Sequence, residues 1–214
     1  MKTCRRQLID DFLTNSESYF RGIVLDIGGK KSDKRGEFRP PLNKVDQWTY
    51  LNIDSTTLPD ILASADSIPF LDKSVDTFIM SEVIEHLVEP EKCLAEAARI
   101  LKPNGHGIIT IPFLYPIHAD PWDFQRWTDA RISREISHAG LELIEFYPMG
   151  GLIAVVIDLI QIRINEYPKS SILLKKCGFA LLKIIKFIVA GRIRKSNPRI
   201  NTGFSLIVRK PEID

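Results

Sequence analysis

Residues 22–29 read GIVLDIGG, an apolar run that ends in an acid and two glycines. A continuous apolar run of this length is typical of a strand buried on both faces of a parallel sheet. Ligands of such sheets bind beyond the carboxyl ends of the strands, where Asp26, Gly28 and Gly29 are expected. Glycine at that place lets backbone amides approach a ligand closely. The stretch therefore predicts an α/β fold with a nucleotide-type site at the end of this strand.

Strand and helix patterns alternate along the rest of the chain, as a doubly wound sheet requires. Strands are predicted at residues 48–54, 60–64, 74–81, 106–113, 141–148 and 203–212, and helices at residues 4–20, 89–101 and 129–140. The KPNG sequence at 102–105 is expected to form a turn that stops the second helix. Prolines 40 and 41 oppose a long helix in residues 30–47, so this crossover is expected to be short or irregular. We predict a single domain over 1–214, with a Rossmann-like, seven-stranded, mostly parallel sheet and helices on both faces.

The composition is that of an ordinary globular protein. Of the 214 residues, 44% are hydrophobic and 26% are charged, which opposes both disorder and a protein with many membrane spans. Cys4, Cys93 and Cys177 lie far apart, which opposes a disulfide framework and a cysteine-rich zinc site. The N-terminus lacks the apolar run and cleavage site of a secretory signal, so a cytoplasmic protein is predicted.

Charge is distributed unevenly along the chain. Residues 1–162 contain 17 Lys and Arg against 24 Asp and Glu, whereas residues 163–199 contain 10 against 1. The net charges of the two segments are therefore −7 and +9. This contrast indicates a separate role for the second segment.

About fifty residues separate the strands predicted at 141–148 and 203–212, far more than a hairpin loop contains. Residues 150–200 are therefore expected to form a basic, apolar, helical insertion between strands six and seven. On a helix of the second apolar segment, 171–191, four lysines would lie within about 100° of one another beside a broad apolar face. These lysines are Lys175, Lys176, Lys183 and Lys186.

A basic stripe beside an apolar face is typical of helices that lie on a membrane surface. Two interpretations of residues 152–198 remain open: contact with a membrane surface, and a lid that buries its apolar face over the substrate with its lysines in solvent. The two are compatible. Few aromatic residues are available for stacking on bases, so nucleic acid is not the expected partner. The insertion would then attach a cytoplasmic protein peripherally to the inner face of a membrane.

Four stretches, the first of them within residues 22–29, follow one another in a recognisable order. They are VLDIGG at 24–29, LASADSIPF at 62–70, FIMSEVIEHLVEP at 78–90 and RILKPNGHGIITIP at 99–112. Through them, residues 20–148 resemble the class I S-adenosylmethionine-dependent methyltransferases, specifically the methyltransferase-11-like group. Four ordered motifs are far more specific than any one of them.

This resemblance implies S-adenosyl-L-methionine as the cofactor and assigns its contacts. They are Asp26 for the amino-acid end, Gly28 and Gly29 beneath it, Asp54 for the ribose, Ala65 and Asp66 for adenine, and Ser81 beside the transferred methyl group. The sequence departs from the family at Lys30 and Lys31, which stand where a third glycine is usual. The same departure removes the glycine spacing of dinucleotide-binding dehydrogenases.

Charged and aromatic residues are interleaved in the stretch 112–128, PFLYPIHADPWDFQRWT. Such a mixture can bind a sugar or another ring. The catalytic candidates are His118, preferred as the general base, and His86, Asp123 and Arg126, with Asp120 as a further acid nearby. The alternative is that Asp123 and Arg126 form an internal ion pair that orders the loop.

A metal is a further possibility at this site. Glu82, Glu85 and His86, together with His118, resemble the metal-binding set of small-RNA 2'-O-methyltransferases and of some O-methyltransferases of quinone pathways. Magnesium at these residues would assist the deprotonation of a hydroxyl. The same SEVIEHL sequence also occurs in members without a metal, where the acid and the histidine support the loop. The sequence leaves the choice open.

The main hypothesis is an enzyme that transfers a methyl group from S-adenosylmethionine to an oxygen or nitrogen of a small-molecule, glycan or lipid-linked acceptor. Residues after the fifth strand also resemble methyltransferases found with bacterial surface-polysaccharide enzymes. One alternative is a catalytically degenerate, membrane-associated binding protein on the same fold. The other is a metal-assisted RNA 2'-O-methyltransferase.

Overall fold

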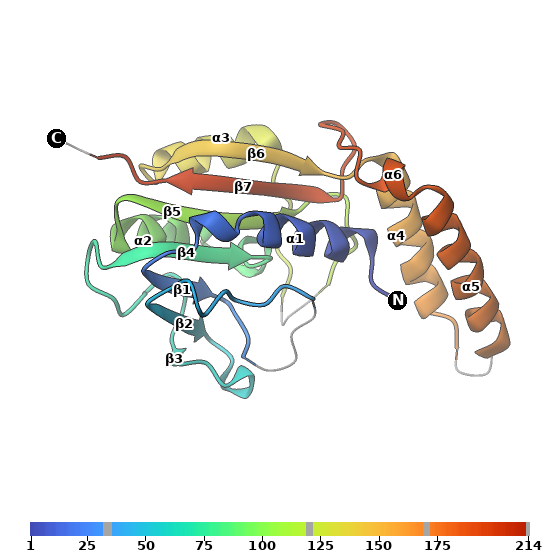
Figure 1. The fold of residues 1–214 in the computed structure, drawn as a ribbon, viewed down its shortest axis with the longest axis horizontal. Coiled ribbons are helices and arrows are strands. Elements are labelled where there is room, and N and C mark those ends of the chain that lie inside the picture. Colours follow the sequence, from blue (N-terminus) through green and yellow to red (C-terminus); the bar gives the residue numbers. More distant parts are fainter. Residues whose placement is uncertain (32–35, 119–121, 169–171, 213–214) are drawn as a thin grey trace.

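The computed structural model describes residues 1–31, 36–118, 122–168 and 172–212, and a seven-stranded sheet forms its centre (Figure 1). The strands are β1 Ile23–Ile27, β2 Gln47–Asn52, β3 Ile61–Leu62, β4 Val75–Ser81, β5 Leu101–Pro112, β6 Glu142–Met149 and β7 Gly203–Arg209. Their order is β3-β2-β1-β4-β5-β7-β6, and only β7 runs antiparallel to its neighbours. The predicted fold class is therefore confirmed.

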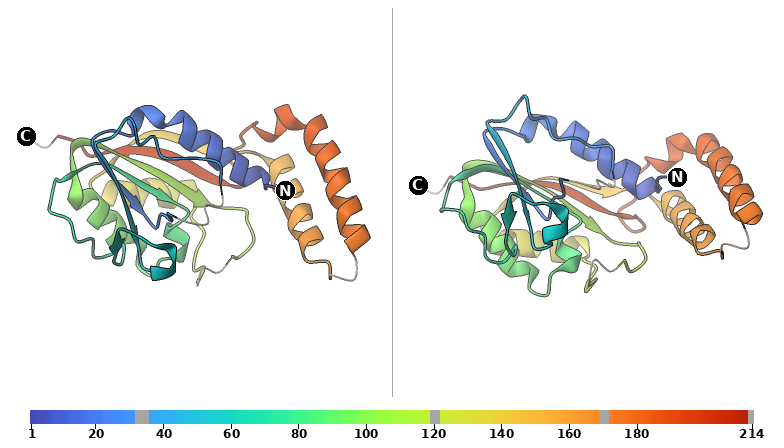
Figure 2. Two further views of the ribbon diagram at one scale, coloured as in Figure 1. Left: turned by 60° about the horizontal axis from the view of Figure 1, so that its bottom comes forward. Right: turned by 90° about the horizontal axis from the view of Figure 1, so that it is seen from below.

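Helices cover both faces of this sheet. The helices of the described residues are α1 Cys4–Asn15, α2 Pro90–Ile100, α3 Asp129–His138, α4 Leu152–Asn165, α5 Ile172–Ile188 and α6 Ala190–Ile193, with the short 3₁₀ helices η1 Glu17–Tyr19, η2 Ser55–Thr57 and η3 Ile84–His86. Helix α1 lies on one face, and α2 and α3 lie on the other (Figure 2). Residues 28–31 and 36–46, the described part of the first crossover, contain turns but no helix, in keeping with the prolines there.

Alternating side chains of the central strands divide between two hydrophobic clusters. Val24, Ile79 and Ile108 pack with Ile9 and Leu13 of α1 on one face. The larger cluster on the opposite face includes the strand residues Leu25, Phe78, Ile109 and Leu206 together with α2 and α3. Both faces are dry, which explains why these strands are continuously apolar in sequence. Each such buried side chain contributes about 1.5–3 kcal/mol by leaving water.

The largest differences from the predicted limits are at the first helix and the fifth strand. Helix α1 ends at Asn15, where the backbone N–H and the hydroxyl of Ser16 both donate to the Phe12 carbonyl at 2.9 Å, and the chain continues as η1. The expected KPNG turn lies within β5 as a bulge. Val75 pairs with Leu101 whereas Thr77 already pairs with His106, so the extra residues leave the ladder.

The insertion between β6 and β7 consists of α4, α5 and α6, which project beside the end of the sheet (Figures 1 and 2). It has a small core of its own, in which Ile157, Ile164, Leu182 and Ile193 pack with Cys4 of α1. No helix of the described residues has the length and apolar character needed to cross a membrane.

Asp158 of α4 attaches the insertion to the N-terminus of α1. Its carboxylate accepts from the backbone N–H of Cys4 at 2.6 Å and of Arg5 at 2.9 Å, while the Thr3 hydroxyl accepts from Arg6 N–H. Free N–H groups and the helix dipole both favour an acid at this position. Lys186 of α5 adds a bond to the Lys2 carbonyl at 2.7 Å.

We expect Asp158 to make stability depend on pH. Burial raises the pKa of Asp158 above its usual value, although the two N–H groups oppose this. The folded protein therefore holds more protons, and the contribution of Asp158 to stability is greatest below the unfolded pKa and falls as the pH rises through the folded pKa. The free energy of unfolding of the wild type, relative to Asp158→Asn, should fall as the pH rises from about 4 towards neutrality. Urea denaturation at several pH values measures this difference, and a constant difference would contradict the assignment.

Candidate active site

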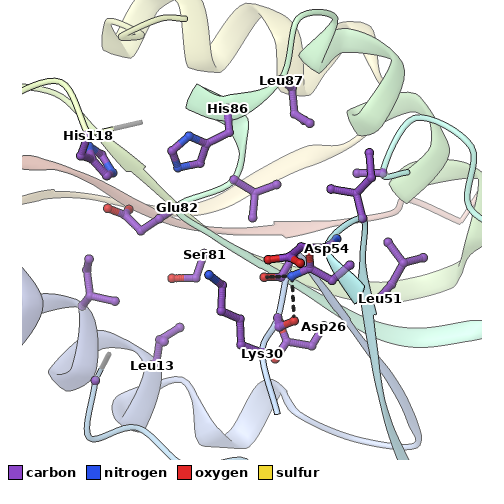
Figure 3. A pocket seen from close by; sticks show the side chains of 18 of the residues that line it. Leu13, Asp26, Lys30, Leu51, Asp54, Ser81, Glu82, His86, Leu87 and His118 are labelled. Atoms are coloured by element: carbon purple, nitrogen blue, oxygen red, sulfur yellow. Dashed lines mark hydrogen bonds between the residues drawn. The ribbon is translucent and has the colours of Figure 1, made fainter. Parts of the chain in front are cut away.

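A cavity of about 1120 Å³ opens at the carboxyl ends of β1, β2 and β4. Figure 3 shows Asp26 and Asp54 on one side of it, His86 and His118 on the other, and Ser81 between them. Pockets for small ligands usually measure about 300–1000 Å³, so this cavity has room for a nucleoside-type ligand and a second molecule.

The loop after β1 is shaped by close packing around two glycines. Gly28 has a φ of +76°, and a Cβ there would lie 2.6 Å from Val83 Cγ2. A Cβ on Gly29 would lie 2.3 Å from Asp26 Cγ. The side-chain amide of Asn52 donates to both glycine carbonyls at 3.0 Å. The loop therefore keeps its tight shape without the third glycine.

Asp54 lines the cavity just beyond β2. Its carboxylate accepts from Thr56 N at 2.9 Å and Thr56 Oγ1 at 2.7 Å. These hydrogen bonds, assisted by the charge of Lys30, lower the pKa of Asp54 below its usual value. Lys30 itself lines the cavity, so the residue that departs from the family pattern lies inside the site.

The remaining cofactor candidates divide between the cavity and the surface. Ala65 is buried in the cavity wall, but Asp66 is exposed and lies outside the lining. Ser81 lines the cavity, and its hydroxyl lies 2.9 Å from Thr110 Oγ1. The structure thus brings Asp26, Gly28, Gly29, Asp54, Ala65 and Ser81 to one cavity and leaves Asp66 beside it.

A buried ion pair lies between the two ends of the cavity. Glu82 follows β4 with a φ of +59°, and Arg5 of α1 donates to it through Nε at 2.9 Å and Nη2 at 2.5 Å. Burial alone would raise the pKa of Glu82, but the charge of Arg5 holds it below its usual value. Thr110 Oγ1 donates to the same carboxylate at 3.0 Å, and Arg5 Nη1 donates to the Thr202 carbonyl at 2.5 Å. Glu82 is therefore already fully engaged by the protein.

Glu85, three residues further, has a different environment. Its side chain is completely buried, and neither carboxylate oxygen accepts a hydrogen bond from the described residues. His86 Nε2 and His118 Nε2 each lie 3.6 Å from Glu85 Oε1. Their Nδ1 atoms face backbone carbonyls instead, of Trp122 at 2.5 Å and of Pro116 at 3.2 Å. Burial raises the pKa of Glu85, and the neighbouring Glu85 carboxylate raises that of His118.

The Glu85 cluster can hold either a proton or a metal ion. Ligand atoms of Glu85, His86 and His118 all lie within 4.8 Å of one another. A backbone carbonyl at the second nitrogen of each ring is the usual support for a histidine that binds a metal through its other nitrogen. Glu82 is not available as a fourth ligand, because Arg5 occupies its carboxylate. The four-residue set suggested by the sequence is thus reduced to three.

Asp123 and Arg126 order the loop around His118. The Asp123 side chain is buried. It accepts from the backbone N–H of His118 at 2.9 Å and from Arg126 Nη2 at 2.7 Å. Arg126 also donates to the Tyr115 carbonyl at 3.4 Å. Neither Asp123 nor Arg126 lines the cavity, so the geometry favours the internal ion pair over direct contact with an acceptor. Asp120 lies outside the described residues.

Aromatic side chains form the wall beside the two histidines. Tyr115, Trp122 and Phe124 all line the cavity. Trp122 is 65% exposed and Phe124 is 50% exposed. The ring of Tyr115 packs against His118 on one side, with centroids 5.4 Å apart, and lies under the Arg5 guanidinium. Exposed rings at a cavity mouth offer a stacking surface to a flat or cyclic ligand.

The sequence pattern did not identify Arg5 and Asn52. Asn52 closes an apolar strand two residues before Asp54, a position that could have drawn attention to it. No local pattern could have linked Arg5 to Glu82, because 77 residues separate them.

Removing one partner of the Arg5–Glu82 pair should strongly destabilise the fold. Arg5→Met leaves a buried carboxylate uncompensated, which typically costs about 3–5 kcal/mol. The double variant Arg5→Met/Glu82→Met should lose less than the sum of the single variants, because it removes both charges. Urea denaturation measures these differences. Lys92→Met, which breaks the exposed pair with Glu89, is the control and should change little; an equally small effect of Arg5→Met would contradict the role of the buried pair.

The sequence of the chain resembles those of known methyltransferases. The family model described as "Methyltransferase domain" matches residues 43–109. The mitochondrial 2-methoxy-6-polyprenyl-1,4-benzoquinol methylase of Caenorhabditis elegans is 32% identical over 82 residues, which are 38% of this chain and 24% of that protein. The ubiquinone/menaquinone biosynthesis C-methyltransferase of Brucella anthropi is 28% identical over 109 residues, 48% of this chain and 35% of that protein. The chain thus spans well under half the length of these curated relatives.

The fold resemblance covers more of the chain. The structure of phosphoethanolamine N-methyltransferase 2 of Haemonchus contortus with S-adenosyl-L-methionine matches with a TM-score of 0.60 at 16% identity. That match covers 96% of this chain and 52% of the other. The family motifs predict contacts with this cofactor at the loop of Gly28 and Gly29, at Asp54 and at Ala65. All four residues line the cavity, so the residues present fit S-adenosylmethionine. The chain has the fold of the class I S-adenosylmethionine-dependent methyltransferases, and residues 43–109 within it match the methyltransferase domain model.

Proposed function

We propose that the protein transfers a methyl group from S-adenosylmethionine to an oxygen or nitrogen of a small-molecule, glycan or lipid-linked acceptor. The observation that supports this most is the single cavity with two chemically different ends. Asp26 and Asp54 lie at one end, and His118 lies at the other beside an aromatic wall. A donor and an acceptor bound at these two ends would meet near Ser81.

At the donor end, each residue can meet one part of the cofactor. The tight turn at Gly28 and Gly29 lets the backbone pass beneath the amino-acid portion. Asp54, whose pKa lies below its usual value, presents a carboxylate that can accept hydrogen bonds from both ribose hydroxyls. We infer that Lys30, inside the same cavity, faces the cofactor carboxylate. When bound, the cofactor supplies a methyl group on a positively charged sulfur, which needs little further activation.

At the acceptor end, His118 is placed to take a proton. The acceptor oxygen would attack the methyl carbon while its proton passes to His118 Nε2, and the carbon–sulfur bond would break with its electron pair returning to sulfur. Glu85 would stabilise the protonated imidazole, which is consistent with the raised pKa of His118. Asp123 and Arg126 position His118 without touching the acceptor.

The aromatic wall indicates the class of acceptor. Trp122 and Phe124 offer exposed rings against which a sugar or another ring can stack. The similar methylase of Caenorhabditis elegans is named for a benzoquinol that carries a polyprenyl chain. Together these favour a glycan or another ring carried on a lipid.

The Glu85 cluster supports a second candidate, in which a metal ion assists the transfer. Two imidazole nitrogens and one carboxylate suit a divalent transition-metal ion better than magnesium, which prefers oxygen. The ion would be held by Glu85, His86 and His118 and would lower the pKa of the acceptor hydroxyl. RNA as the acceptor receives no support from the cavity, because no described residue of the basic segment 163–199 lines it.

Asp54→Ala should weaken S-adenosylmethionine binding roughly tenfold or more while the fold remains intact, because it removes a charged hydrogen-bond acceptor from an exposed position. Calorimetric titration with S-adenosylmethionine and S-adenosylhomocysteine measures the affinity. Asp46→Ala, at an exposed aspartate outside the cavity, is the matched control and should bind like the wild type. Unchanged affinity of Asp54→Ala would contradict the ribose assignment. Absence of binding by folded wild type would favour the degenerate binding protein.

His118→Asn should reduce turnover about 10²–10⁴-fold, the usual contribution of a general base. S-adenosylhomocysteine release across a panel of sugar, phenol and lipid-linked hydroxyl acceptors measures this. His106→Asn, on β5 and outside the cavity, is the control and should keep full turnover.

The same panel separates the base from the metal-assisted candidate. Turnover that persists after chelator treatment would exclude the metal. If turnover is lost and Mn²⁺ or Zn²⁺ restores it, the metal is required. Direct titration of the chelated protein with Co²⁺, compared with Glu85→Gln, then shows whether Glu85 holds the ion.

A further inference from the structure

Helix α5 has two faces that are both apolar, and only one of them is covered. Phe179, Leu182, Ile185 and Val189 pack towards α4 and α6 in the core of the insertion. The opposite face spans about 140° of the helix circumference. It exposes Leu173 at 75%, Leu174 at 63%, Leu181 at 59%, Ile184 at 58%, Phe187 at 85% and Ile188 at 72%.

The four lysines of α5 do not act as one solvated stripe. Lys175 Nζ donates to the Asn165 carbonyl at 2.7 Å, and Lys186 Nζ donates to the Lys2 carbonyl and to Gln161 Oε1. Lys175 therefore faces the end of α4, and Lys186 faces α4 and the N-terminus. Lys176 and Lys183 are exposed and border the apolar face. The lid interpretation expects the reverse arrangement, with the apolar face inside and the lysines outside.

We propose that the exposed apolar face of α5 docks on an anionic lipid bilayer, with the helix lying in the plane of the interface. The six exposed apolar side chains of that face would enter the acyl boundary, and Lys176 and Lys183 would meet the head groups. A helix with an apolar face and cations at its border has the character that such interfacial binding requires. This proposal goes beyond methyl transfer and does not depend on it.

Charge selects the lipid surface over a second copy of the chain. Lys176 and Lys183 border the apolar face and are exposed, so two copies facing each other through α5 would bring like charges together. Anionic head groups instead attract each nearby cation. Arg192 and Arg199, both exposed, add to the attraction.

The position of the insertion connects this face to the acceptor end of the cavity. Asp158 of α4 binds the backbone of Cys4 and Arg5, and the Arg5 side chain lines the cavity beside Tyr115. Helix α4 and the start of α1 therefore connect the docked helix to the cavity wall, and an acceptor carried on a lipid would approach the cavity from the same bilayer.

Vesicle sedimentation tests the proposal with the whole protein and two lipid mixtures, phosphatidylcholine alone and phosphatidylcholine with phosphatidylglycerol. The wild type should bind the anionic vesicles and lose binding at high salt. Leu181→Ser/Phe187→Ser should weaken binding by roughly tenfold or more, because each buried apolar side chain contributes strongly to partitioning. Leu71→Ser/Ile144→Ser, at exposed apolar sites on the main domain, is the matched control and should bind like the wild type.

A second pair of variants tests the charge. Lys176→Glu/Lys183→Glu should reduce binding to the anionic vesicles, whereas Lys44→Glu/Lys92→Glu on the main domain should not. Absence of vesicle binding, or binding that the α5 variants leave unchanged, would overturn the proposal. It would also be overturned by a dimer in sedimentation velocity that Leu181→Ser/Phe187→Ser dissolves, because the face would then be a self-interface. S-adenosylmethionine affinity, measured on the same protein, separates this result from failure of the proposed enzyme activity.

Discussion

The buried pair of Arg5 and Glu82 joins parts of the chain that lie far apart in the sequence. It links the start of α1 to the residue after β4, and Arg5 also binds the carbonyl of Thr202 just before β7. Burying two charges is costly, and their attraction compensates only when the hydrogen bonds are complete. Here Thr110 adds a further donor to the carboxylate. The pair also holds Glu82 at a positive φ, so it determines the course of the chain where the two ends of the cavity meet.

The pair also explains why two nearby glutamates differ in chemistry. Glu82 is neutralised by Arg5, whereas Glu85 is buried without a hydrogen bond from the described residues and faces two imidazoles. A carboxylate of the second kind is unfavourable unless a proton, a histidinium or a metal ion accompanies it. The unfavourable burial of a carboxylate is thus found at the acceptor end, where a proton or a metal ion would be bound during the reaction. The cofactor end is instead satisfied by hydrogen bonds, as at Asp54 and Thr56.

The insertion also separates groups that have partners in the protein from groups that are exposed. Its polar contacts face inward, where Asp158 caps α1 and Lys186 binds the carbonyl of Lys2. Its outward surface on α5 is apolar, and Phe187 is the most exposed large apolar side chain there, at 85%. Water does not favour such a patch of large apolar side chains. The insertion is therefore attached to the start of α1 by its polar groups and leaves an apolar face of α5 exposed.

The sequence by itself determined the sheet and the cofactor end of the cavity, because both depend on short-range patterns. Apolar runs mark the strands, and the glycines and acids that bind ligands stand within a few residues of each strand end, as at Gly28 and Asp54. Only the tertiary structure decided the roles of Glu82 and Glu85, because their partners come from distant segments. It also decided which face of α5 is exposed, since both faces are apolar and only packing against α4 distinguishes them.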